Sequence, residues 1–274
     1  MAVSMADIQH LRKMTGAGMM DCKKALTEAE GDFDKAVEII RKRGQAIAAK
    51  REDRDALEGC VLAGVNGNFA AVVALKCETD FVAKNADFIA LTQSILDLAL
   101  ANKPANLDEL LTLSLNGMPM KDAILEKSGI TGEKMEVGFY EFVNGESPIA
   151  YIHPGNKLAT VVVFNQPGIE VHACKDVAMQ VAAMAPVAVT RDQVPAEIVE
   201  KEFIVAKEKA REEGKPENML DKIAEGRINK FYKESVLMEQ EFVKDAKQTI
   251  KQYLQSISKD LAATDFKRVT LNAD

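Results

Sequence analysis

Two similar apolar runs constrain the fold of this chain more than any other feature. The first reads Phe69-Ala-Ala-Val-Val-Ala-Leu75 and the second Leu158-Ala-Thr-Val-Val-Val-Phe164, and an apolar helical pattern follows each of them. Short runs rich in β-branched residues favour strands, whereas apolar residues at every third or fourth position favour helices. We therefore predict an α+β fold whose core holds two copies of one antiparallel sheet-plus-helix unit.

Turn residues separate the predicted strands. Asn66-Gly67 divides runs 60–65 and 69–75, because this dipeptide suits the positive φ angles of a tight hairpin. The second copy has strands over 135–143, 149–152 and 158–164, divided by Asn144-Gly145 and Pro154-Gly155. The helices that follow the two copies, over 88–100 and 171–185, each end before a proline.

Both flanks of this core are helical by pattern. Residues 4–44 read as three short helices, with Ser4 as a cap and Gly16-Ala-Gly18 as a break. The charged segment that follows them is a linker or a solvated helix end. Two apolar stripes within 197–233, on either side of Gly214-Lys-Pro216, predict an antiparallel helical hairpin that projects into solvent. The chain closes with a helix and a strand.

These patterns divide the chain into four predicted parts. A three-helix domain and its linker occupy 1–53, and the first core subdomain occupies 54–139. The second core subdomain combines 140–185 with 235–274, and the hairpin is inserted between them at 186–234.

Composition excludes several classes of partner. The chain has 274 residues, 47% of them hydrophobic, and a net charge of −7, so it lacks the positive surface that nucleic-acid phosphates attract. No apolar run reaches the length of about 18 residues that a membrane-spanning helix needs, and the N-terminus lacks a secretory signature. We expect a cytoplasmic protein that binds another protein or a small molecule.

Nothing in the sequence predicts a metal site or a cofactor. The four cysteines are scattered without a C-x-x-C pair and are expected to be buried and reduced: Cys22, Cys60, Cys77 and Cys174. Phosphate-loop, dinucleotide, zinc-protease and serine-hydrolase motifs are absent, so we expect a protein that is not an enzyme. A thiol enzyme with Cys77 as nucleophile and His153 as base is the alternative, although such a cysteine usually packs in a core.

The candidate functional segment is Thr79-Asp80-Phe81-Val82, at the junction between a strand and a helix. Adjacent side chains on such a turn present a carboxylate and a bulky apolar ring together. Such a pair is better suited to inserting between elements of a partner protein than to catalysing a reaction. The alternative interpretation is that the segment is a helix-capping turn.

Two other places are candidate partner contacts. His153 beside Pro154-Gly155 can hydrogen-bond the backbone of a partner, or it is a solvated turn histidine. Of Met19 and Met20, one is expected to face outward, because only one side of so short a helix can be buried. Arg12 and Lys23 either line this patch or are plain solvated charges.

Two segments carry a resemblance to a known family. Leu11-Arg-Lys-Met-Thr-Gly-Ala-Gly-Met-Met-Asp-Cys-Lys-Lys-Ala-Leu26 and Cys77-Glu-Thr-Asp-Phe-Val-Ala-Lys84 resemble the two signatures of the elongation factor Ts family. Its members are guanine-nucleotide exchange factors for elongation factor Tu in bacterial translation. The resemblance covers nearly the whole chain and implies a ubiquitin-associated-like helical domain, a two-part core and a coiled-coil protrusion.

The resemblance also implies roles for particular residues. Thr79, Asp80, Phe81 and Val82 would bind elongation factor Tu, in its GDP-bound or nucleotide-free form, and dislocate its magnesium ion. Leu11, Arg12, Met19 and Met20 would contact the same GTPase domain, and His153 would help to flip a phosphate-loop peptide of that partner. A second copy of this chain, contacted through the 186–234 hairpin, is the other predicted partner.

The chain departs from the family pattern in two places. The family usually has a glycine-rich and then basic segment after this histidine, whereas the chain reads Pro154-Gly-Asn-Lys-Leu-Ala159. Many members continue beyond the last strand, whereas this chain ends at Asp274, so contacts of a C-terminal module are expected to be absent. The alternative function is an adaptor that binds ligands through its N-terminal helical domain.

Overall fold

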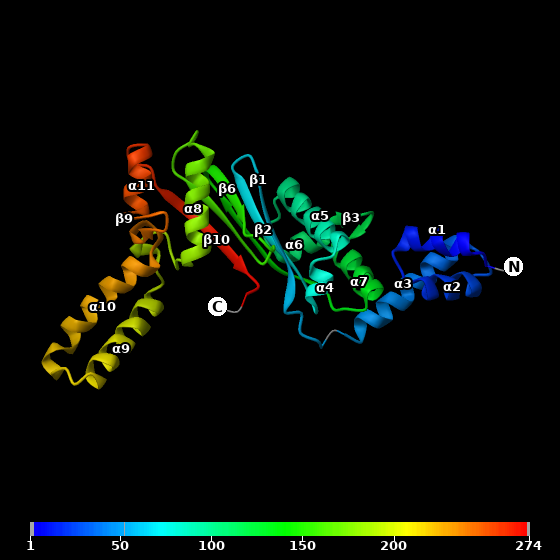
Figure 1. Cartoon of the computed structure of the whole chain (residues 1–274), viewed down its shortest axis with the longest axis horizontal. Coiled ribbons are helices and arrows are strands. Elements are labelled where there is room, and N and C mark those ends of the chain that lie inside the picture. The colour runs from blue at the N-terminus through cyan, green and yellow to red at the C-terminus, as the bar shows by residue number, and fades with distance from the viewer. Residues whose placement is uncertain (1–2, 52, 273–274) are drawn as a thin grey trace. The chain divides into compact units, whose positions relative to one another are not determined.

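A computed structural model describes residues 3–51 and 53–272 of the chain as a mixture of helices and sheets, which confirms the α+β class (Figure 1). The chain forms two compact units. One comprises Met1–Leu62, Val73–Tyr140 and Thr270–Asp274, and the other comprises Ala63–Val72 and Glu141–Val269. The finer division into four parts stays a prediction, and Met1, Glu52 and Asp274 within it lie outside the described residues. No helix in the described ranges is long and apolar enough to cross a membrane.

The first unit begins with three helices, α1 (Met5–Thr15), α2 (Met19–Glu28) and α3 (Phe33–Ala49). Ser4 caps α1 as predicted, since its hydroxyl accepts the Asp7 N–H at 3.1 Å and the Asp7 carboxylate accepts the Ser4 N–H in return. Gly16, with φ at 72°, ends the helix. Helix α3 runs to Ala49, five residues beyond the end at residue 44 that the sequence predicts.

Helix α3 packs closely on α7 (Met120–Thr131). Gly44 of α3 and Gly129 of α7 meet at the crossing, where a Cβ added to Gly129 would lie 2.2 Å from the Gly44 Cα. Gly129 therefore cannot carry a side chain at this crossing without a shift of the backbone, whereas a Cβ added to Gly44 would lie 3.4 Å or more from its neighbours.

The first sheet has the strand order β1-β2-β5, so the predicted strand over 135–143 pairs in this sheet and not with the strands of the second copy. Its strands are β1 (Glu58–Asn66), β2 (Phe69–Cys77) and β5 (Glu136–Asn144). The tight turn consists of Gly67, with φ at 62°, and Asn68, one residue later than the sequence predicts. The segment between β2 and β5 forms four helices and a small hairpin: α4 (Asp80–Ala83), α5 (Ala86–Asn102), α6 (Leu107–Thr112), β3 (Ser114–Leu115), β4 (Met118–Pro119) and α7.

The second unit contains a sheet of order β10-β7-β6 with α8 (Val171–Met184) packed on it (Figure 1). Its strands are β6 (Glu146–Ile152), β7 (Leu158–Phe164) and β10 (Ala263–Thr270). β7 is buried along its whole length, and it pairs antiparallel with β6 so that Ile149 faces Val162. The core is completed by α11 (Ile250–Ile257) and the short pair β8 (Glu241–Phe242) and β9 (Asp245–Thr249).

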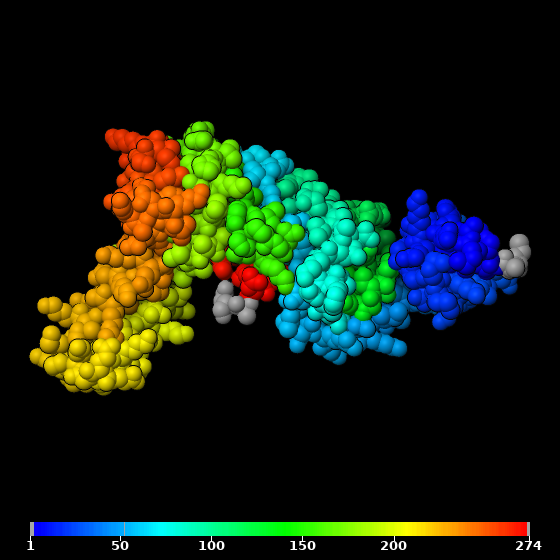
Figure 2. Space-filling model, in the orientation of Figure 1, coloured from blue at the N-terminus to red at the C-terminus, as the bar shows by residue number. Residues whose placement is uncertain are grey.

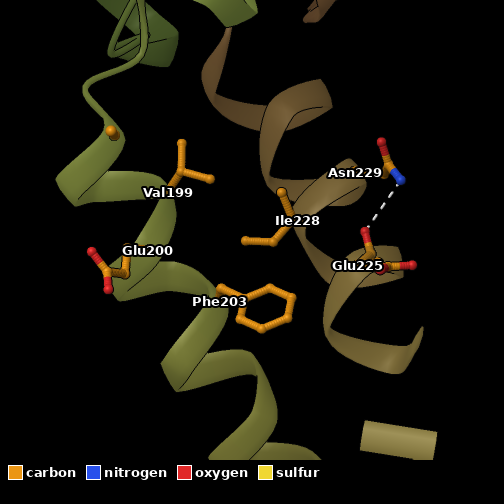
Figure 3. A pocket seen from close by; sticks show the side chains of 7 residues that line it. Val199, Glu200, Phe203, Glu225, Ile228 and Asn229 are labelled. Atoms are coloured by element: carbon orange, nitrogen blue, oxygen red, sulfur yellow. Dashed lines mark hydrogen bonds between the residues drawn. The ribbon is translucent and has the colours of Figure 1, made fainter. Parts of the chain in front are cut away.

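The predicted helical hairpin consists of α9 (Ala196–Glu212) and α10 (Leu220–Ser235), and Figure 2 shows it, in yellow and orange, standing out from the rest of its unit. The predicted apolar stripes line its inner faces. Val199 and Phe203 of α9 point towards Ile228 of α10 (Figure 3). Ion pairs such as Arg227–Glu213, at 2.7 Å, link α10 to the C-terminal end of α9. Self-association through this hairpin stays a prediction.

Candidate functional site

The Thr79–Val82 segment forms a capped turn at the end of β2. The Thr79 hydroxyl accepts the Val82 N–H at 3.4 Å and caps α4, a helix of only four residues. The helix-capping interpretation is therefore correct for Thr79. It does not exclude the interpretation as a partner contact, because the side chain of Phe81, two residues after the cap, is exposed.

Phe81 is the most exposed large hydrophobic side chain in the part of the chain that the structure describes, with 84% of its surface open to solvent. Beside it, the Asp80 carboxylate accepts a hydrogen bond from Lys84 Nζ at 2.6 Å, which raises the pKa of Lys84. Val82 is half-buried and Ala83 is buried, so the last two residues of α4 pack against the protein whereas Phe81 does not. An acid and an unpacked ring are thus presented together, as the sequence predicts.

A reciprocal set of hydrogen bonds holds this turn, and we call it the Glu78–Glu133 clasp, made by Glu78, Thr79, Glu133 and Lys134. The Glu133 carboxylate accepts the N–H groups of Glu78 at 3.2 Å and Thr79 at 3.0 Å, and the Thr79 hydroxyl at 2.6 Å. In return, the Glu78 carboxylate accepts the Lys134 N–H at 2.7 Å. The sequence did not predict a role for Glu133, because a single glutamate 54 positions from Thr79 belongs to no motif or periodic pattern that links the two residues.

Two arginines that follow α3 also bind Glu78. Arg51 Nη1 and Arg54 Nη1 donate to its carboxylate at 3.1 Å and 3.0 Å. Burial by itself would raise the pKa of Glu78, but the hydrogen bonds from Lys134, Arg54 and Arg51 outweigh it and lower the pKa below 4.5. The ionised carboxylate is therefore the form that the fold stabilises.

We expect the first unit to lose stability in acid through Glu78. Because its pKa is lower in the folded than in the unfolded chain, its contribution is present above the unfolded value of 4.5 and lost as pH falls through the folded value. Thermal unfolding of the native protein and of Glu78→Gln, followed from neutral pH downwards, measures this contribution. The difference between the two midpoints should shrink in acid, and a difference that stays constant would contradict the prediction.

The N-terminal candidates divide between surface and core. Met20 is 64% exposed and Arg12 and Lys23 are exposed, whereas Met19 packs partly on the helical core, so one methionine does face outward. Leu11 is fully buried, with 0% of its surface exposed. Its predicted partner contact has no exposed surface in this conformation, because the side chain fills the core of the three helices. Contact between a partner and Arg12, Met19 or Met20 stays a prediction.

His153 lies in the second unit, at the start of the turn between β6 and β7. Its N–H donates to the Leu158 carbonyl at 2.8 Å, and its carbonyl accepts the Asn156 N–H at 3.1 Å. Pro154 and Gly155, with φ at 92°, occupy the two central positions, as a type II turn requires. The ring is exposed, and its Nδ1 shares a 2.9 Å hydrogen bond with the Tyr151 hydroxyl.

Cys77, the nucleophile of the thiol-enzyme alternative, has 0% of its surface exposed. All four cysteines are buried, as predicted. The Cys77 thiol donates to the Thr79 carbonyl at 3.2 Å, inside the turn it precedes. The structure places Thr79, Asp80, Phe81 and Val82 on one turn. Arg12 lies on α1 and Met19 and Met20 lie on α2 of the same unit.

Comparison with known proteins identifies the family. The family described as Elongation factor TS matches residues 78–273, which include the Thr79–Val82 turn, the clasp and His153. The elongation factor Ts of Porphyromonas gingivalis strain ATCC 33277 is 61% identical over 275 aligned positions, and that of Azobacteroides pseudotrichonymphae is 53% identical over 274. That of Bacteroides thetaiotaomicron is 47% identical over 331 positions. Each alignment covers 100% of both chains, and this chain therefore belongs to the elongation factor Ts family.

Proposed function

We propose that this chain is a translation elongation factor that binds elongation factor Tu and promotes the release of its GDP, so that GTP can rebind. The observation that carries the proposal is the 84% exposed ring of Phe81, held beside Asp80 on a capped turn in a member of this family. The factor itself binds no nucleotide in this proposal. Because coupling is reciprocal, the incoming nucleotide must in turn weaken the grip of the factor and release it.

The proposed mechanism acts on the magnesium ion of the partner. Magnesium in nucleotide sites is held by few protein ligands together with the phosphates, so displacing those supports weakens nucleotide binding. Phe81 would wedge between elements of the GTPase domain, while the Asp80 carboxylate disturbs the ion. Burying a phenylalanine contributes about 1.5–3 kcal/mol, which is comparable with typical coupling energies between two ligands.

Release of a fluorescent GDP analogue from elongation factor Tu tests this function. We expect release to accelerate with the concentration of this protein and to saturate. Unchanged release would refute the proposal. Binding without faster release would instead support the adaptor alternative.

His153 should contribute a smaller share of the exchange rate. We expect His153→Ala to slow GDP release about 2- to 12-fold, the effect of losing one hydrogen bond to the partner. His172→Ala is the matched control, because this histidine is also exposed but lies on α8. If the two variants have equal rates, His153 has no specific role in exchange.

A further inference from the structure

We propose that Glu133 is a positioning residue, which sets the conformation of the Thr79–Val82 turn before any partner arrives. The consequence for exchange rests on the function proposed above. The conformational claim concerns the free protein alone and can be tested separately.

The turn needs an outside support because its own helix is too short to provide one. Helix α4 has four residues, and a single helical turn is unfavourable in isolation. Glu133 supplies the missing contacts, since its carboxylate accepts three donors from the two residues that precede the helix. Hydrogen bonds to an ionised group are roughly twice as strong as those between neutral groups.

The Thr79 hydroxyl transmits this support to the functional side chains. It donates to Glu133 at 2.6 Å and accepts the Val82 N–H at 3.4 Å, so one oxygen joins the carboxylate to the residue that follows Phe81. A change at Glu133 therefore reaches the backbone on both sides of the ring. No contact between Glu133 and the partner is needed for this effect.

Glu133 is itself held in place. Its carbonyl accepts the Ser128 hydroxyl at 2.5 Å, which fixes the residue just beyond the end of α7. Lys134, the next residue, donates its N–H to Glu78, which Arg51 and Arg54 bind from the other side. Hydrogen bonds therefore run from Glu78 and Thr79 to Glu133 and from Lys134 to Glu78. They attach the turn to the end of α7, and the two arginines attach it to the segment after α3.

Positioning of this kind matters because an ordered binding residue loses less conformational entropy when it associates. With Glu133 intact, the Phe81 ring is already presented for insertion. Without it, the turn samples other conformations, and only a fraction of them can insert the ring. Exchange would then be slower even though Phe81 itself is unchanged.

A single tryptophan can report the mobility of the turn in the free protein. The chain contains no tryptophan, and the Phe81 side chain is exposed, so Phe81→Trp adds one emitter at the tip. We expect Glu133→Ala to lower the fluorescence anisotropy of this tryptophan, while circular dichroism shows a folded chain. Glu136→Ala is the matched control, because that carboxylate pairs with the side chains of Lys76 and Lys134 and should leave the anisotropy unchanged. Equal anisotropy in the Glu133 and Glu136 variants would overturn the proposal.

Exchange kinetics distinguish a positioning role from general destabilisation. We expect Glu133→Ala to lower the maximal rate of GDP release by about 5- to 30-fold, the factor that corresponds to a loss of about 1–2 kcal/mol. Glu133→Gln, which keeps one acceptor oxygen, should recover part of the loss. In the Asp80→Ala, Phe81→Ala background, Glu133→Ala should cause no further loss, and an equal loss in both backgrounds would overturn the proposal. If the background substitutions themselves leave release unchanged, the proposed function fails, whereas the anisotropy result still decides the role of Glu133.

Discussion

Replacing Asp80 and Phe81 together by alanine should slow GDP release from elongation factor Tu by about 5- to 150-fold, the range of typical coupling between two ligands. The double variant keeps the Thr79 cap and the clasp, because both are made by other side chains and by backbone groups. What it removes is the exposed ring and the charge beside it. Stopped-flow release of fluorescent GDP at saturating factor measures the loss.

The control for this variant is an equivalent truncation elsewhere on the surface. Val171 is an exposed apolar residue at the start of α8, so Val171→Ala removes apolar surface without touching the turn. We expect native exchange rates from that control and native circular dichroism from both proteins. If the double variant exchanges nucleotide at the native rate, the turn is not the site of exchange.

Periodicity and capping residues predicted much of the fold because they act over short distances. Ser4, Gly16 and the apolar stripe of the hairpin each act within a few residues, and the structure confirms all three. The small hairpin β3–β4 was not predicted, since strands of two residues are too short to show an alternating pattern.

The candidate site shows where local patterns stop being informative. The turn at Asp80 and Phe81 could be predicted, because polar residues interrupt the sequence between the apolar run of the strand and the apolar pattern of the helix. Glu133 could not, because it lies 54 positions from Thr79 and only the fold brings the two together. For Leu11 the two kinds of reasoning differ. Residues three positions apart share one face of a helix, so Leu11 lies on the same face as Ile8, and the structure buries both. The family resemblance instead implies a partner contact for Leu11.

The clasp also connects the turn to the crossing of α3 and α7. Arg51 follows α3 and Glu133 follows α7, and both bind the segment Glu78–Thr79. The relative placement of these two helices therefore decides whether Arg51 and Glu133 can reach that segment together. Gly129 sets this placement, because the absence of a side chain there lets the backbone of α7 lie against Gly44 of α3.

Gly129→Ala should consequently impair both stability and exchange. The added Cβ would lie 2.2–2.3 Å from backbone atoms of Gly44, and no side-chain rotation can relieve such a contact. Overpacking of this kind costs about 1–3 kcal/mol. We expect a lower free energy of unfolding by denaturant titration and faster hydrogen exchange in α3 and α7. GDP release should also slow, because Arg51 and Glu133 would no longer both reach the segment Glu78–Thr79 that they bind.

Replacing Gly226 by alanine provides a control, because we expect it to raise the free energy of unfolding whereas Gly129→Ala lowers it. Gly226 lies within α10, and a Cβ added there would meet nothing within 4 Å. Alanine is more favourable than glycine inside a helix by about 0.8–1 kcal/mol, so Gly226→Ala should stabilise the chain and leave exchange unchanged. Because both variants add one methyl group to a helix, their difference isolates the backbone contact at Gly44. Equal stability of the two variants would show that the helix crossing tolerates a side chain, and that α3 and α7 do not set the geometry of the clasp.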